Sequence, residues 1–295
     1  MRVLHLSDVH VTVPVGRLPW HQMLNKRLIG AANLVLRRGH HFAGAREKLQ
    51  ALSVLSRERS VDLVVCTGDY TALGTDTELA AARAAIECLT DRPHGFITVP
   101  GNHDIYLQDV VRERRFERHF GTYLESDLPE RCVDGPWPLV KLYDGIAVIA
   151  VNSARPNPAV WRSSGAIPDA QLTALAALAQ DERIRSRFVF VITHYAPRRP
   201  DATADHKLHG LENADAFLDA CRGLPRYAIL HGHIHHRFAL ELAGYGTRLF
   251  GAGSATCAGR EGFWLFDIEA GARKATPGHL EHDHYVLDES AAISF

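Results

Sequence analysis

Side chains that can bind a metal or move a proton cluster directly after short apolar runs of this sequence. The clusters are SDVH at residues 7–10, GDY at 68–70, GNHD at 101–104, THY at 193–195 and HGHIH at 231–235. Placing Asn102, His103 and Asp104 side by side at one strand end is costly unless partners satisfy them. A turn alone explains Pro100 and Gly101 but not the three residues that follow, so the pattern indicates a site.

The donor types in these clusters narrow the chemistry. They are His, Asp and Asn without Cys, a set that suits manganese, iron, zinc or cobalt better than copper(I). An aspartate can bridge two cations with its two oxygens, while neutral imidazoles fill the outer positions. Each cluster alone occurs by chance in many chains, but the whole set in this order is specific.

Apolar, β-branched runs of about five residues predict the strands that position these clusters. Between several of them, residues 45–59, 77–89 and 168–180 have the spacing of helices. Alternating strands and helices indicate a mostly parallel sheet, whose ligands gather at the carboxyl ends of the strands. Two late runs, TRLFGAGSAT and GFWLFDIEA, predict a second, more antiparallel layer. We expect one α/β domain over residues 1–295, with the tail at 279–285 as a solvated terminal segment.

Together the clusters resemble the calcineurin-like metallophosphoesterase superfamily, in its bacterial phosphodiesterase and UDP-diacylglucosamine hydrolase-like branch. The likeness spans nearly the whole chain, from Asp8 to His235, and extends to GAIPDAQL and the late GAGS. It implies an α/β fold, a four-layer αββα sandwich of two sheets between helices. It also implies a dinuclear centre of two divalent or trivalent metal ions, with manganese, iron and zinc as candidates.

The resemblance implies seven metal ligands, none of which departs from the family pattern. The first ion would be held by Asp8, His10 and His235, the bridge would be Asp69, and the second ion would be completed by Asn102, His194 and His233.

Two cations roughly 3.5–4 Å apart lower the pKa of a bridging water, which makes a hydroxide nucleophile at neutral pH. The oxygen that leaves the phosphorus then needs a proton or a positive neighbour. His103 is the candidate, because the resemblance places it beside the metals rather than on them. Asp104 is expected to accept a hydrogen bond from His103 and so fix its tautomer.

Three further histidines are weaker candidates for substrate binding. His206 and His209 follow His194 on a loop that we expect to border the pocket, and His231 precedes the GHIH turn. A structural role is the more common interpretation of each.

Residues 14–44 form an insertion between the first metal cluster and the first predicted helix. Its basic pairs, Lys26-Arg27 and Arg37-Arg38, flank an apolar middle. We favour a capping helix packed beside the active site with solvated basic residues. The alternative is an interfacial element that contacts lipid or membrane through apolar residues and snorkelling Arg and Lys. In both cases the insertion should shape access to Asp8 and His10.

Composition sets the remaining expectations. The net charge of −1 gives no global attraction to nucleic acid, so we expect a small anionic substrate attracted locally and no nucleic-acid partner. The five scattered cysteines argue against a disulfide framework. Because the sequence starts a strand almost at once, without a charged leader, we expect a cytoplasmic protein, with peripheral contact to the inner face of a membrane as the alternative. The sequence does not predict an oligomeric state.

These observations predict a dinuclear metal-dependent phosphoesterase that hydrolyses a small phosphodiester such as a cyclic nucleotide. One alternative is a pyrophosphate hydrolase acting on a lipid-linked nucleotide sugar, which the insertion favours. A nuclease or protein phosphatase is a further alternative, weakened by the lack of a basic stripe. A scaffold without catalysis is disfavoured because His103 and Asp104 are both present. The metal clusters are common to every catalytic option, so they do not select the substrate.

Overall fold

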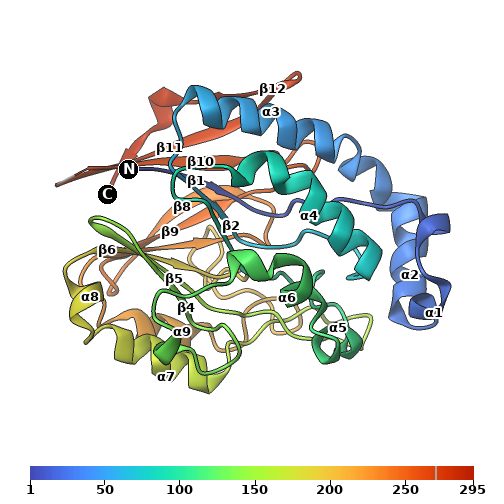
Figure 1. Ribbon diagram of the computed structural model, residues 1–295, viewed down its shortest axis with the longest axis horizontal. Helices are drawn as coiled ribbons and strands as arrows, with labels where there is room; N and C mark the ends of the chain where they lie inside the picture. Colours follow the sequence, from blue (N-terminus) through green and yellow to red (C-terminus); the bar gives the residue numbers. More distant parts are fainter. Residues whose placement is uncertain (270) are drawn as a thin grey trace.

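The computed structural model describes residues 1–269 and 271–295, apart from the side chains of Arg37, Arg38 and His40. Two β-sheets stack face to face, and helices cover their outer faces (Figure 1). This arrangement confirms the predicted four-layer α/β sandwich.

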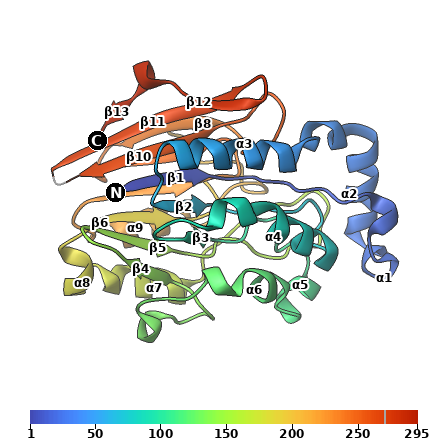
Figure 2. The same ribbon diagram turned by 45° about the horizontal axis from the view of Figure 1, so that its top comes forward.

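The first sheet has the strand order β12-β11-β10-β1-β2-β3, with β13 paired to β11. Its strands are β1 (Arg2–Leu6), β2 (Leu63–Cys66), β3 (Phe96–Thr98), β10 (Phe263–Glu269), β11 (Ala272–Glu281), β12 (His284–Leu287) and β13 (Ile293–Ser294). The strands β1, β2 and β3 run parallel, and their last residues Leu6, Cys66 and Thr98 are register partners. The loops that follow them therefore leave the sheet side by side (Figure 2).

The second sheet has the order β4-β5-β6-β7-β9-β8. Its strands are β4 (Leu139–Leu142), β5 (Ile146–Ala150), β6 (Phe188–Ile192), β7 (Tyr227–His231), β8 (Arg237–Leu242) and β9 (Thr247–Ala252). The four strands β5, β6, β7 and β9 run parallel. Because Ile192 and Leu230 are register partners, the ends of β6 and β7 also lie together.

The two sheets and their helices pack through two apolar layers. Phe190 on β6 and Phe250 on β9 each contact Phe266 on β10, with ring centroids 5.0 Å apart in both pairs, and so join the sheets. Helices α3 (Ala45–Glu58) and α4 (Asp76–Thr90) pack on the first sheet. Helices α7 (Asp169–Leu178) and α9 (Ala214–Cys221) pack on the second, and α8 (Glu182–Arg185) precedes β6.

The three predicted helices agree with α3, α4 and α7 to within about two residues at each end. The period of leucines explains the agreement, since Leu49, Leu52 and Leu55 all face the core. Helix α4 also begins with a capping box between Thr75 and Glu78, which satisfies its first backbone donors.

Two expectations about the late strands were wrong. The runs at 247–256 and 263–270 do not form one layer, because β9 joins β7 in the second sheet and β10 joins β1 in the first. The tail at 279–285 is not a free terminal segment. It lies in the antiparallel pair of β11 and β12, with Leu280 opposite Tyr285.

Residues 14–44 contain α1 (Trp20–Met23) and α2 (Lys26–Asn33), followed by a π-helical turn at Leu34–Arg38. Short 3-10 turns lie at Val15–Arg17 and Gly39–Phe42. Helices α1 and α2 stand at one end of the molecule, at the right of Figure 1. The helices α5 (Gln108–Arg112) and α6 (Arg115–Phe120) follow the GNHD loop. Among the described residues, none of the helices combines the length and apolar composition needed to cross a bilayer.

Candidate metal centre

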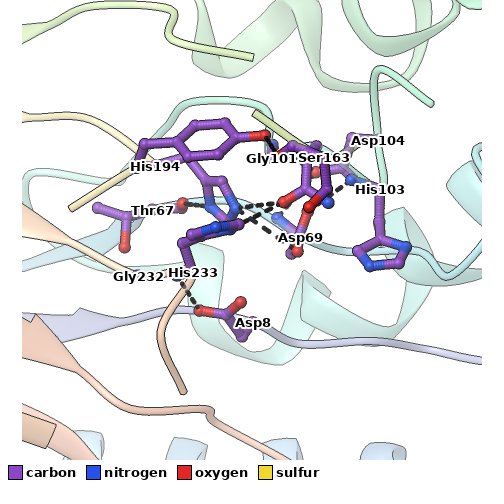
Figure 3. Close-up of polar contacts among 12 residues, drawn as sticks. Asp8, Thr67, Asp69, Gly101, His103, Asp104, Ser163, His194, Gly232 and His233 are labelled. Carbon is purple, nitrogen blue, oxygen red and sulfur yellow. Dashed lines mark hydrogen bonds and ion pairs between the residues drawn. The ribbon is translucent and has the colours of Figure 1, made fainter. Parts of the chain in front are cut away.

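The loops after β1, β2, β3, β6 and β7 bring the seven predicted ligands together. Figure 3 shows four of them, Asp8, Asp69, His194 and His233. Five of the seven have a left-handed backbone, with φ between 43° and 69°. They are Asp8, His10, Asp69, His233 and His235. A residue other than glycine in this backbone conformation costs about 1–3 kcal/mol of folding free energy. Such strained residues are concentrated at functional sites.

The first group of donors surrounds Asp8 Oδ1. Nε2 of His235 lies 2.9 Å from this oxygen, and Nε2 of His10 lies 3.8 Å from it. The two imidazole nitrogens are 3.2 Å apart. Donor atoms from Asp8, His10, Asp69 and His235 all lie within 4.8 Å of one another, as a single ion requires.

The second group of donors converges on Asn102. Its side-chain Oδ1 lies 3.1 Å from His194 Nε2 and 3.0 Å from His233 Nδ1. Asp69 connects the two groups, because its Oδ2 is 3.5 Å from His194 Nε2 and 3.9 Å from His10 Nε2.

Only one oxygen of Asp69 faces both groups, which corrects the expectation that both oxygens would bridge. The other oxygen, Oδ1, accepts a hydrogen bond of 2.8 Å from the backbone N–H of His103. Oδ2 is therefore the atom placed to bridge two ions.

Backbone carbonyls fix the histidine tautomers. Nδ1 of His10 lies 3.0 Å from the Thr71 carbonyl, and Nδ1 of His194 lies 2.7 Å from the Thr67 carbonyl. Since a carbonyl can only accept, each Nδ1 carries the proton and each Nε2 presents a lone pair to the centre. The same reasoning applies to His233, whose Nε2 lies 3.0 Å from the His209 carbonyl and whose Nδ1 faces Asn102.

Two glycines allow the loops to approach this closely. A Cβ on Gly101 would lie 2.1 Å from Asp69 Oδ1, and one on Gly232 would lie 2.5 Å from Asp8 Oδ2 and closer still to Ser7 Oγ. Side chains at these positions would displace two predicted ligands, which explains the glycines of GNHD and GHIH.

The electrostatics of the buried carboxylates call for positive charge. Burial, together with the charges of Asp8 and Asp104, raises the pKa of Asp69 well above its usual value. Burial opposes ionisation of Asp8 as well, but the neighbouring His235, His194 and His10 lower its pKa below the usual range. Against burial, the charge of Asp8 raises the pKa of His235 to about 10. Cations at the centre would let both carboxylates ionise together.

The donor set fits two metal ions. Lone pairs from His194 Nε2 and His233 Nδ1 both point at Oδ1 of Asn102, an arrangement that is repulsive until a cation lies between them. Imidazole, carboxylate and amide oxygen suit manganese, iron or zinc, and the described residues place no cysteine among the donors.

His103 lines the same pocket, but Asp104 does not orient it as expected. Nδ1 of His103 lies 2.7 Å from the Ala72 carbonyl. This carbonyl, and not Asp104, therefore accepts the hydrogen bond that fixes the tautomer of His103. The Asp104 carboxylate instead accepts hydrogen bonds from the loop backbone. Its donors are the N–H groups of Asp69, Tyr70, Thr71 and Gly101 and the Thr71 hydroxyl. Asp104 therefore holds the GDY and GNHD loops together beneath the centre, and burial raises its pKa to about 7 in spite of these donors.

The three weaker histidines lie in different places. His209 lines the pocket and its ring contacts that of His233 in a tilted arrangement, with centroids 4.5 Å apart. Nδ1 of His209 also lies 3.1 Å from Asp205 Oδ2, which anchors this loop. His206 is exposed and is not among the described residues that line this pocket. His231 is fully buried against Phe238 and so cannot touch a substrate.

A pocket of about 310 Å³ opens over the centre. Besides His103 and five of the predicted ligands (His10, Asp69, Asn102, His233 and His235), its lining includes Lys26, Leu34 and Tyr106 and the loop residues Val160, Trp161 and Arg162. The sequence offered no signal for the 160–162 loop, because its residues come from a stretch with neither periodicity nor a motif. Lys26 had been noted only as a basic end of the insertion.

Comparison with known proteins agrees with this geometry. Residues 1–237 match the calcineurin-like phosphoesterase family, so the chain belongs to that family. No curated protein matches the sequence significantly. Among solved structures, a dimetal phosphatase from Danio rerio is similar with a TM-score of 0.63 and 13% identity, over 97% of this chain and 98% of that one. A purple acid phosphatase from yellow lupin seeds has a TM-score of 0.61 and 10% identity, over 99% of this chain and 53% of that one.

The fold, the family and the centre define a metallophosphoesterase. The protein is a metal-dependent hydrolase of phosphoric esters.

Proposed function

We propose that the protein hydrolyses a phosphodiester of a small organic molecule. The supporting observation is the charge on the pocket wall. The described residues that line the pocket include one lysine, Lys26, and one arginine, Arg162. Arg162 is paired with Glu212. Among the lysines and arginines of this described lining, Lys26 is left to balance substrate charge outside the metal centre, which suits the single negative charge of a diester better than the double charge of a monoester.

Lys26 is held where it can perform this role. Its Nζ donates hydrogen bonds to the carbonyls of Asn157 and Arg162 and lies 4.7 Å from the centre of the Tyr106 ring. An ammonium group has three donors, so one remains to bind a phosphoryl oxygen.

The two ions, when bound, supply a nucleophile from water at neutral pH and screen the phosphoryl oxygens. The chain's own residues position the other groups of the reaction. Nε2 of His103 is directed away from its Ala72 anchor and, when protonated, can donate to the leaving oxygen. Asn102 and His233 form the side of the site nearest His209.

A second candidate is hydrolysis of a pyrophosphate bond in a lipid-linked nucleotide sugar. The observation that favours it is the apolar character of the outer wall, where Leu34, Val160 and Trp161 line the pocket beyond Lys26. An acyl chain leaving the metal centre along this wall would contact these side chains.

A substrate panel separates the candidates. The enzyme reconstituted with manganese is offered p-nitrophenyl phosphate, bis-p-nitrophenyl phosphate, cyclic nucleotides, UDP-N-acetylglucosamine and its diacylated analogue. We expect kcat/KM for diesters to exceed that for the monoester at least tenfold. A preference for the monoester would contradict the proposal, and a preference for the acylated pyrophosphate over all soluble diesters would replace it with the second candidate.

A further inference from the structure

Helix α2 buries a charged residue and exposes apolar ones. Arg27 is fully buried, while the adjacent Leu28 and Ile29 are 60% and 58% exposed. Water-facing helices of soluble proteins normally show the opposite pattern, with apolar residues turned inward. The outer face of α2 therefore needs an explanation other than packing within this chain.

The exposed apolar side chains form a continuous surface along the insertion. Leu24 lies just before α2, Leu28 lies within it, and Leu36 lies in the turn that follows it, so exposed leucines occur along the whole segment. Leu24 is 74% exposed and Leu36 79%. We call the outer face the α2 face; its exposed members are Trp20, Leu24, Leu28, Ile29, Val35 and Leu36.

The α2 face is held rigidly in place by the opposite side of the helix. Arg27 pairs with Asp109 and donates from Nε to the Leu73 carbonyl at 2.7 Å. Gly30 packs so closely that a Cβ there would lie 2.6 Å from Leu73. The helix thus packs beside the pocket as the expected cap does, but the expectation of solvated basic residues was wrong for Arg27, which is buried while the leucines are outside. The side chains of Arg37 and Arg38, the second basic pair, are not among those that the structure describes.

The apolar surface continues across the mouth of the pocket. Lys26, next to Arg27, donates to the carbonyls of Asn157 and Arg162, which fixes α2 against the 157–162 loop. On that loop Trp161 is 74% exposed and Val160 is also exposed. Both residues line the pocket together with Leu34.

The charge of the insertion is one-sided. Residues 14–44 contain Arg17, Lys26, Arg27, Arg37 and Arg38 but neither Asp nor Glu, although the whole chain has a net charge of −1. Arg27 is buried and paired with Asp109, so the basic excess comes from the other four residues. A surface that combines exposed leucines, tryptophans and a local excess of basic residues has the composition of an interfacial membrane-binding element. Tryptophan in particular favours the depth of the lipid headgroups.

We propose that the α2 face and Trp161 dock this enzyme on the surface of an anionic lipid bilayer. The leucines enter the boundary between headgroups and acyl chains, and the two tryptophans flank them. The mouth of the pocket then lies beside the membrane surface. This surface is separate from the diester proposal, because it binds lipid whether or not the substrate is a lipid.

Vesicle flotation tests the surface directly. The metal-loaded protein is mixed with vesicles of phosphatidylcholine that contain about 30% phosphatidylglycerol, in a buffer of ~0.1 M salt. The fraction of the protein that floats with the vesicles is then measured. We expect the wild type to float with these vesicles and at least tenfold less with vesicles of pure phosphatidylcholine.

The test variant is Leu24→Ser/Leu28→Ser/Leu36→Ser, and the matched control is Val54→Ser/Val133→Ser, which removes exposed apolar side chains elsewhere. The triple variant should lose vesicle binding at least tenfold and keep its metal content and its rate on bis-p-nitrophenyl phosphate, while the control should bind like the wild type. Absence of wild-type binding, or equal binding by the triple variant, would overturn the proposal. A concentration-dependent dimer in sedimentation that the triple variant loses, without lipid binding by the wild type, would assign the face to a second copy of this chain instead.

Discussion

Nε2 of His10 and Nε2 of His235 lie 3.2 Å apart, and the proton of His10 is committed to the Thr71 carbonyl on its other nitrogen. Two ring nitrogens at this distance need a proton or a cation between them. Asp8, whose Oδ1 is 2.9 Å from His235, makes the same demand with a negative charge. The pair is thus arranged for positive charge, and the metal-dependent account starts from this contact.

The role of His103 can be separated from metal binding. His103→Ala should keep both ions but lower kcat by about 10²–10⁴-fold on substrates with poor leaving groups, as removal of a general acid does. The loss should shrink for p-nitrophenolate, which leaves without a proton. Steady-state kinetics on a series of aryl diesters measures this, with His206→Ala as the control because His206 is exposed and is not among the described residues that line the pocket. An equal loss for every leaving group would remove His103 from the role.

Asp104 should matter for stability more than for chemistry. The carboxylate of Asp104 accepts hydrogen bonds from five donors. In Asp104→Asn the side-chain NH2 group, itself a donor, would face some of them, so we expect the unfolding free energy to fall by about 3 kcal/mol or more. Urea denaturation measures it. The control Asp76→Asn removes an exposed carboxylate paired with Arg118 and should cost about 1 kcal/mol or less. Wild-type stability with lost activity in Asp104→Asn would instead support a direct part in the reaction.

Stability should fall in mild acid because of His231. Burial lowers the pKa of His231 to about 4, below the value near 6.5 in the unfolded chain. The unfolded state therefore binds more protons between these pH values, and folding free energy is lost as pH falls from 6.5 toward 4.

His231→Gln removes this titration. The stability difference between wild type and variant should narrow by about 2 kcal/mol from pH 7 to pH 5, as two unfolding curves at each pH would reveal. His279→Gln, a change of a surface histidine paired with Glu281, should leave the difference constant. A wild type that retains its advantage over His231→Gln at pH 5 would contradict the burial argument.

Substrate charge should be recognised by Lys26. Lys26→Gln should raise KM for a diester at least tenfold with a smaller change in kcat, because the ammonium binds substrate outside the reacting bonds. Lys207→Gln, on an exposed loop, is the control. A fall in kcat alone would place Lys26 in the transition state rather than in binding.

The sequence predicted that the loops carrying the candidate ligands meet, because each follows a buried strand. The carboxyl ends of β1, β2 and β3 in one sheet and of β6 and β7 in the other bring them together. The apolar runs indicated the strands that precede the first three loops, and the structure adds that these strands end in register at Leu6, Cys66 and Thr98. Long apolar periodicity made α3, α4 and α7 equally predictable.

The errors arose where a side chain bonds to the backbone of a distant loop. Asp104 was expected to accept a hydrogen bond from its neighbour His103, but apart from Gly101 its partners lie 33 to 35 residues away at 69–71. The carbonyls of Thr67, Thr71 and Ala72 orient three histidines, and no sequence pattern marks a carbonyl. The burial of Arg27 was missed for the same reason, because its partner Asp109 lies 82 residues away.

The central claim is that the chain holds two metal ions, and metal counting tests it most directly. The wild type, Asp69→Ala, Asn102→Ala and the control Asn33→Ala are stripped with chelator, reconstituted with manganese or zinc, desalted and analysed by mass spectrometry. We predict two equivalents per chain in the wild type and in Asn33→Ala, and one or fewer in the two ligand variants, with turnover of bis-p-nitrophenyl phosphate lost in parallel. Fewer than two equivalents in the wild type, or two equivalents retained in both ligand variants, would contradict the account.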